Sequence, residues 1–66
     1  MEITINGQTQ IVSEGLTAAQ LIEQMGLAGR RIAMEVNLDI VPRSAYAEHA
    51  LNPGDRVEIV HAVGGG

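Results

Sequence analysis

One segment with helical periodicity, GLTAAQLIEQMGLAG, most constrains the fold, because the other long apolar patterns of the chain show the alternation typical of β-strands. Thr17 suits a helix N-cap, and Gln20 three residues later completes a capping box. Leu16 and Leu21 occupy the two positions of a hydrophobic staple, and Gly26 suits a left-handed C-terminal cap. The sequence therefore predicts one short helix, whose apolar face comprises Ala18, Leu21, Ile22 and Met25.

Strand patterns lie on both sides of this helix. EITIN alternates apolar and polar residues, Asn6-Gly7 is a strong hairpin signal, and TQIVS (Thr9 to Ser13) reads as the returning strand. After the helix, RIAMEVN predicts a third strand and LDIVPR a short fourth strand that Pro42 ends. The last strand is RVEIVHAV. The predicted order is a hairpin, one helix and three strands.

The segment between the fourth and last strands contains two further signals. SAYAEHAL is expected to form a turn of helix that directs Tyr46 and Leu51 inward. Asn52-Pro53-Gly54-Asp55 predicts a type II turn, because proline and glycine occupy the two central positions.

These elements predict an α+β fold with the β-grasp arrangement of ubiquitin. A mixed sheet of four to five strands carries one main helix on one face, and the last strand lies inside the sheet. Residues 1–63 are expected to form this single domain, and residues 64–66 a flexible C-terminal glycine tail.

Composition excludes several classes of function. The 66 residues carry a net charge of −4 and contain no cysteine, so a disulfide framework and a thiolate metal site are excluded. An acidic chain without a basic cluster or stacking aromatics is a poor ligand for nucleic acid or for an anionic membrane. We expect a cytoplasmic protein with an aliphatic core, because no apolar run has transmembrane length and the N-terminus lacks a signal-peptide pattern.

Polar side chains along the chain do not form a recognisable catalytic or metal site. His49 and His61 lack metal-ligand spacing and are expected at the surface, and no nucleophile motif accompanies the serines. The eight carboxylates are spread out and expected to be solvated. The final strand instead predicts two faces: Val57 and Ile59 point to the helix, whereas Glu58, Val60 and Ala62 are exposed and form a candidate docking surface.

The terminal run Gly64, Gly65 and Gly66 presents a different chemistry. It is not a phosphate-binding loop, because no helix and no lysine follow it. The α-carboxylate of Gly66 is ionised at neutral pH, and attack on the α-phosphate of ATP in a partner enzyme would make it an acyl-adenylate. Glycines would let such a tail enter a narrow active site at any backbone angle.

The chain resembles the ThiS family, the sulfur carrier proteins of thiamine biosynthesis. The resemblance covers the whole chain and rests on VNLDIVPRS, AEHALNPGDRVEIV and Val63-Gly64-Gly65-Gly66. One departure is Asn37-Leu38, where the family often has Asn-Gly after the third strand.

The resemblance implies a carrier that is not an enzyme and binds no cofactor. It implies that a ThiF-type adenylating enzyme activates Gly66 with MgATP, and that sulfur from a donor such as a cysteine desulfurase replaces AMP. The resulting thiocarboxylate then gives its sulfur to thiazole synthase. Gly66 is the implied attachment point, and Gly65, with Gly64 less strictly, allows entry into the partner active sites.

Several alternatives share parts of this chemistry. The small subunit of molybdopterin synthase, a carrier for cysteine or methionine synthesis, and a ubiquitin-like modifier would all use the same adenylate. From a different class, the chain could be a small interaction module whose glycines are incidental or left from an expression linker. Only the carrier and modifier classes predict that removal of the last two glycines abolishes function.

Overall fold

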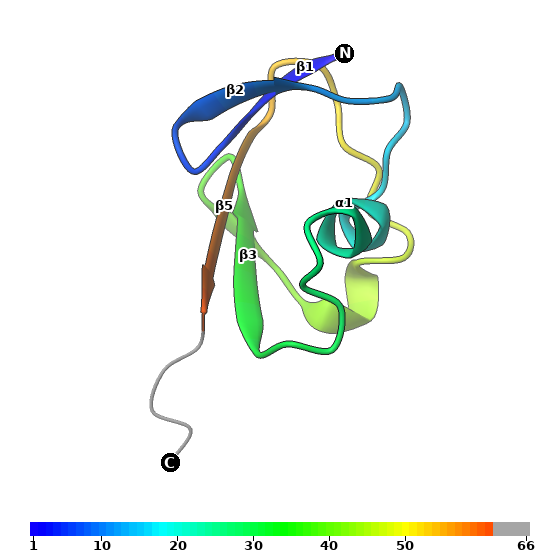
Figure 1. Ribbon diagram of the computed structural model, residues 1–66, viewed down its shortest axis with the longest axis vertical. Coiled ribbons are helices and arrows are strands. Elements are labelled where there is room, and N and C mark those ends of the chain that lie inside the picture. The colour runs from blue at the N-terminus through cyan, green and yellow to red at the C-terminus, as the bar shows by residue number, and fades with distance from the viewer. Residues whose placement is uncertain (62–66) are drawn as a thin grey trace.

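The computed structural model describes residues 1–61, which form a sheet, one α-helix and one 3₁₀ turn. Figure 1 shows the helix packed against one face of the sheet, with the other face uncovered. The five strands are β1 (Glu2–Ile5), β2 (Gln8–Ile11), β3 (Ile32–Val36), β4 (Asp39–Val41) and β5 (Arg56–His61). The helix α1 spans Ala18–Gln24, and the 3₁₀ turn η1 spans Arg43–Ala45.

The sheet is mixed, with the strand order β2-β1-β5-β3-β4. Strands β1 and β5 pair in parallel, and every other neighbouring pair is antiparallel. Strand β5 therefore lies at the centre, as the sequence predicts. This mixed sheet with one helix on one face is the β-grasp fold, and the prediction of the fold is confirmed.

The first hairpin turns at Asn6 and Gly7, which both have positive φ angles of 48° and 82°. A two-residue type I′ turn requires this combination, and it sets Ile5 opposite Gln8. Strand β2 consequently begins at Gln8 and ends at Ile11, earlier at both ends than the predicted span of 9–13.

The N-terminus of α1 is capped by side chains and by a distant loop. The Gln20 amide donates to Thr17 Oγ1 over 3.1 Å, and the Thr17 amide donates to Gln20 Oε1 over 2.9 Å, which confirms the predicted capping box. The amides of the first two helical residues donate to the carbonyls of His49 and Tyr46. The segment after β4 therefore satisfies helix donors that would otherwise lack partners.

The predicted apolar face of α1 is correct except at its last residue. Ala18, Leu21 and Ile22 are buried, but Met25 is 38% exposed. Met25 is the C-cap residue, and the chain leaves the helix direction at Gly26, whose φ is 72°. The Met25 side chain therefore lies at the rim of the core.

The core fills the space between α1, η1 and the helix-facing side of the sheet. Tyr46 and Leu51 are buried in it, as predicted. The buried apolar residues are Ile3, Ile5, Leu16, Ala18, Leu21, Ile22, Ile32, Met34, Val36, Val41, Tyr46, Leu51, Val57 and Ile59.

Asp55 contradicts the expectation that every carboxylate is solvated, because this residue is only 7% exposed. It accepts a hydrogen bond from the Asn52 amide at 2.8 Å and another from Asn37 Nδ2 at 3.0 Å. The tight turn at Gly54, with φ of 83°, folds the carboxylate back onto these donors. Burial is tolerated because both oxygens are hydrogen-bonded.

Candidate functional site at the end of strand β5

Strand β5 positions the candidate site, because the residues that follow it carry the predicted chemistry. It pairs with β3 along its length, from Val36 opposite Val57 to Ile32 opposite His61. Its pairing with β1 is shorter and ends at Val57. The carboxyl end of β5 is therefore held by the sheet on one side only, within the part of the chain that the structure describes.

The Asn6 side chain adds hydrogen bonds to β5 beyond Val57, where the pairing of β5 with β1 ends. Asn6 Nδ2 donates to the Ile59 carbonyl over 3.2 Å, and the Ile59 amide donates to Asn6 Oδ1 over 2.8 Å. The side-chain amide of Asn6 thus makes the two hydrogen bonds that a residue of a neighbouring strand would make on the β1 side of β5. It fixes β5 close to the point where the tail begins.

The uncovered side of the sheet, which we call the open face, carries the predicted docking residues of β5. Val60 is 59% exposed, and Glu58 is exposed beside it. Ala33 lies opposite Val60, and Glu35 lies opposite Glu58. Cross-strand partners share a face, so these four side chains form one surface.

Three large apolar residues on the sheet surface were missed at the sequence level. Ile11 on β2 lies opposite Glu2, which points away from the core, and is 76% exposed. Ile40 lies opposite Glu35 on β4 and is 75% exposed, and Leu38 in the β3–β4 turn is 79% exposed. The alternation of Asp39, Ile40 and Val41 contains a usable signal, because Val41 points to the core and Ile40 must therefore point away.

The other predicted site residues, Ala62, Gly64, Gly65 and Gly66, lie outside the described residues 1–61. The same holds for the predicted division between domain and tail. The structure does show where residues 62–66 are joined to the sheet. This segment follows His61, which ends the central strand β5 and pairs with Ile32 at the start of β3, and His61 itself is exposed as predicted.

Residues 1–61 contain no cluster of three histidine, cysteine or acidic side chains arranged to hold a metal ion. Within the same range, no helix has the length and apolar character needed to cross a membrane. His49 lies partly buried in the loop that caps α1, where its carbonyl accepts a hydrogen bond from the Ala18 amide. The features that the described residues do present are the exposed side chains of the open face.

Comparison with known proteins identifies the family to which the chain belongs. The sequence profile of the ThiS family matches residues 1–66. The chain belongs to the ThiS family. The sulfur carrier protein ThiS of Escherichia coli is 32% identical over 66 residues, and the match covers 100% of both chains. The crystal structure of a ThiS thiamine biosynthesis protein from Geobacter metallireducens has a TM-score of 0.88 and 29% identity, again over both entire chains.

The ThiS-family match also extends to much longer proteins. A thiazole synthase of Paramagnetospirillum magneticum is 44% identical over 66 residues, and one of Magnetococcus marinus is 35% identical. The chain spans 20% of the length of each of these proteins. Sequences related to the ThiS family therefore occur as one part of proteins named for thiazole synthesis.

Proposed function

We propose that this protein is a sulfur carrier for thiazole formation in thiamine biosynthesis, and that it is a co-substrate and not an enzyme. The match over the full length of both chains with the Escherichia coli sulfur carrier protein ThiS carries this proposal. The sulfur atom replaces one oxygen of the C-terminal carboxylate of Gly66, because the chain has no cysteine side chain that could hold it.

The proposed chemistry has two steps. A carboxylate oxygen of Gly66 attacks the α-phosphate of ATP in a partner enzyme, which forms an acyl-adenylate and releases pyrophosphate. Hydrosulfide then attacks the carbonyl carbon and displaces AMP, which leaves a thiocarboxylate and releases a proton. A persulfide donor would form an acyl disulfide instead, and a thiol would then have to cleave its S–S bond. Gly65 and Gly64 keep the tail narrow within the active site.

Three partners follow from this chemistry. A ThiF-type adenylating enzyme supplies the site for ATP and magnesium, a donor such as a cysteine desulfurase supplies sulfur, and thiazole synthase accepts it. The link to thiazole synthase has separate support, since two relatives that contain a matching segment are named thiazole synthases.

The short length of the segment after His61 limits where an adenylating enzyme can bind. The segment 62–66 can span at most about 17 Å, so an enzyme that holds Gly66 must lie close to the end of β5 at His61. Glu58 and Val60 are exposed on the last residues of β5 before this segment, and Ala62 follows them in the sequence alternation. We propose that the adenylating enzyme docks on this exposed aliphatic surface.

The first prediction concerns Gly66. Deletion of this residue should abolish ATP–pyrophosphate exchange by the adenylating enzyme, because the remaining carboxylate falls one residue short of the reacting phosphate. Intact-mass measurement of the wild-type protein, after incubation with that enzyme, MgATP and sulfide, should show replacement of one oxygen by sulfur. A truncated protein that still accepts sulfur would mean that Gly66 is not the attachment site.

The second prediction concerns Val60. Val60→Glu should weaken binding to the adenylating enzyme about tenfold or more, because it places a charge within an apolar contact. Its melting temperature should stay close to that of the wild type, since the side chain is already exposed. Titration calorimetry and thermal melts provide the two measurements.

Gln10→Glu is the matched control for Val60→Glu. It makes the same change in net charge at an exposed residue of β2, at the far edge of the sheet. Equal loss of affinity in both variants would show a general charge effect and would remove the support for docking on the open face.

A further inference from the structure

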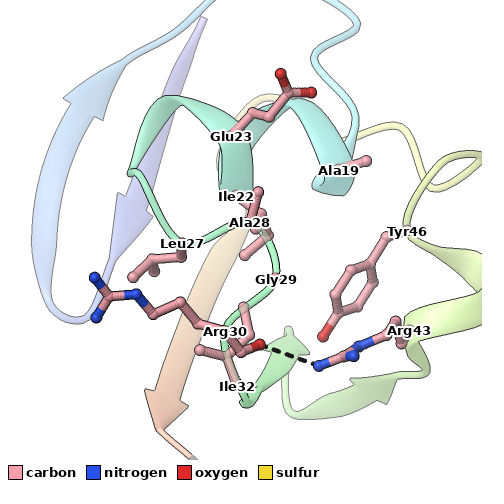
Figure 2. A pocket seen from close by; sticks show the side chains of 10 residues that line it. All are labelled: Ala19, Ile22, Glu23, Leu27, Ala28, Gly29, Arg30, Ile32, Arg43 and Tyr46. Atoms are coloured by element: carbon pink, nitrogen blue, oxygen red, sulfur yellow. Dashed lines mark hydrogen bonds between the residues drawn. The ribbon is translucent and has the colours of Figure 1, made fainter.

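A cleft lies on the opposite side of the sheet from the open face, between α1, the α1–β3 loop and η1. Its volume is about 230 Å³. Figure 2 shows the side chains that line it. The floor is apolar and is formed by Ile22, Leu27, Ile32 and the ring of Tyr46. The cleft is therefore large enough for an apolar side chain of a partner.

One end of the cleft is polar and basic. The Arg43 guanidinium is held there by a hydrogen bond from Nη2 to the Arg30 carbonyl, at 3.1 Å. Figure 2 shows the Tyr46 hydroxyl directed toward the same end. Tyr46 is 8% exposed, so this hydroxyl is fixed in place by a buried ring. Both groups can donate hydrogen bonds to a carboxylate.

The other charged groups around the cleft point elsewhere. Figure 2 shows the Glu23 carboxylate at the far end, directed away from Arg43. The Arg30 guanidinium extends past Leu27 on the outer side of the loop. A negatively charged group is thus attracted at the Arg43 end and repelled at the Glu23 end, which gives a bound segment a preferred direction.

The cleft lies near the carboxyl end of β5. Ile32, on the cleft floor, is the pairing partner of His61, and Arg30 and Arg31 precede it directly. Three of the four basic residues of this acidic chain therefore gather near the end of β5, whereas Arg56 lies at its beginning. The local charge is opposite in sign to the net charge of −4.

We propose that this cleft binds an acidic peptide segment of the enzyme that receives the tail. An apolar side chain of the segment occupies the floor, and an adjacent carboxylate pairs with Arg43 and the Tyr46 hydroxyl. The identity of the enzyme rests on the proposed function, whereas the preference for an acidic and apolar segment rests on the cleft itself. The enzyme would thereby hold the carrier on both sides of the β5 end.

The test uses ¹⁵N-labelled protein and two probe peptides at millimolar concentration, acetyl-Leu-Glu-Leu-Glu-amide and acetyl-Leu-Gln-Leu-Gln-amide. The acidic peptide should cause saturable shifts of the backbone amides in residues 27–32 and 43–46. The neutral peptide should bind about fivefold or more weakly. Equal binding of the two peptides, no saturable shifts, or shifts confined to the open face would each overturn the proposal.

Variants separate a binding role of Arg43 from a structural one. Arg43→Gln should weaken the acidic peptide about five- to tenfold, and Arg43→Lys less, because lysine keeps the charge but not the planar fork. Tyr46→Phe should weaken it about threefold. Arg56→Gln, with the same change in net charge at the other end of β5, should have no effect. Equal effects of the two glutamine variants would overturn the assignment to the cleft.

The same variants applied to the complex distinguish this inference from the proposed function. Arg43→Gln should weaken binding to the adenylating enzyme and reduce its dependence on salt. Wild-type affinity of this variant for the enzyme, together with normal pyrophosphate exchange, would overturn the cleft as a docking site while the carrier function stands. Absence of pyrophosphate exchange with the wild-type protein would instead count against the carrier function. The peptide titration would still show whether the cleft binds an acidic segment.

Discussion

At the scale of single residues, Leu38 is held in a backbone conformation that its side chain disfavours. Its φ is 74°, and the preceding Asn37 has φ of 52°, so the two form a tight turn between β3 and β4. Asn37 is tied to β5, because its side chain donates to Asp55 and accepts from the Arg56 amide at 3.0 Å. These bonds hold the turn in the geometry that Asn-Gly prefers, although leucine occupies the second position.

The prediction at this scale is that Leu38→Gly stabilises the protein. Relief of the left-handed strain outweighs the extra freedom of glycine in the unfolded chain, for a net gain of about 0.5–1 kcal/mol. A thermal melt should show a rise in Tm of about 2–8 °C. Leu38→Ala is the control, because it removes the exposed side chain but keeps the Cβ atom at positive φ. A decrease in Tm for the glycine variant would refute the strain argument.

At the scale of secondary-structure elements, core residues and proposed docking residues alternate along the single strand β5. Ile59 faces the helix and is buried, whereas the adjacent Val60 is on the open face. Because successive side chains of a strand point to opposite faces, neighbouring substitutions should have very different effects. The strand itself is held by β3 and by the Asn6 side chain in both cases.

Ile59→Ala should therefore lower the free energy of unfolding by about 2–5 kcal/mol, because it leaves a cavity in a small core. This is a large share of a total that rarely exceeds about 5 kcal/mol in a domain of this size. Val60→Ala should change the free energy by less than about 0.5 kcal/mol. Urea denaturation measures both. Similar losses in the two variants would show that the open face is packed in solution.

At the scale of the whole molecule, one apolar core joins the helix and the sheet, and among the described residues 1–61 its members run from Ile3 to Ile59. A protein that consists of residues 1–63 should therefore have the same melting temperature as the full chain, within experimental error. Differential scanning calorimetry of the two proteins provides the comparison. A drop of several degrees would show that the glycine tail contributes to the packed domain, and the predicted boundary between residues 63 and 64 would be wrong.

The sequence by itself determined the features that depend on local backbone chemistry. The capping box of Thr17 and Gln20, the left-handed Gly26 and the Asn6-Gly7 turn depend on residues close together in the chain, and the structure confirms all three. Alternation along the last strand likewise predicted which side Ile59 and Val60 face. The family assignment also follows from sequence, because the motifs that carry it are contiguous.

Tertiary structure alone decided the features that join distant parts of the chain. The buried Asp55 carboxylate accepts a hydrogen bond from Asn37, 18 residues away. The Ile59 amide donates to the side chain of Asn6, 53 residues away. Alternation could indicate that Ile40 points away from the core, but its place beside Glu35 follows only from strand pairing. The cleft brings together residues of α1, the α1–β3 loop and the segment after β4, and Arg43 meets the Arg30 carbonyl 13 residues away. Periodicity reports which way a residue points along its own element, but the neighbour that it meets is set by how the elements pack.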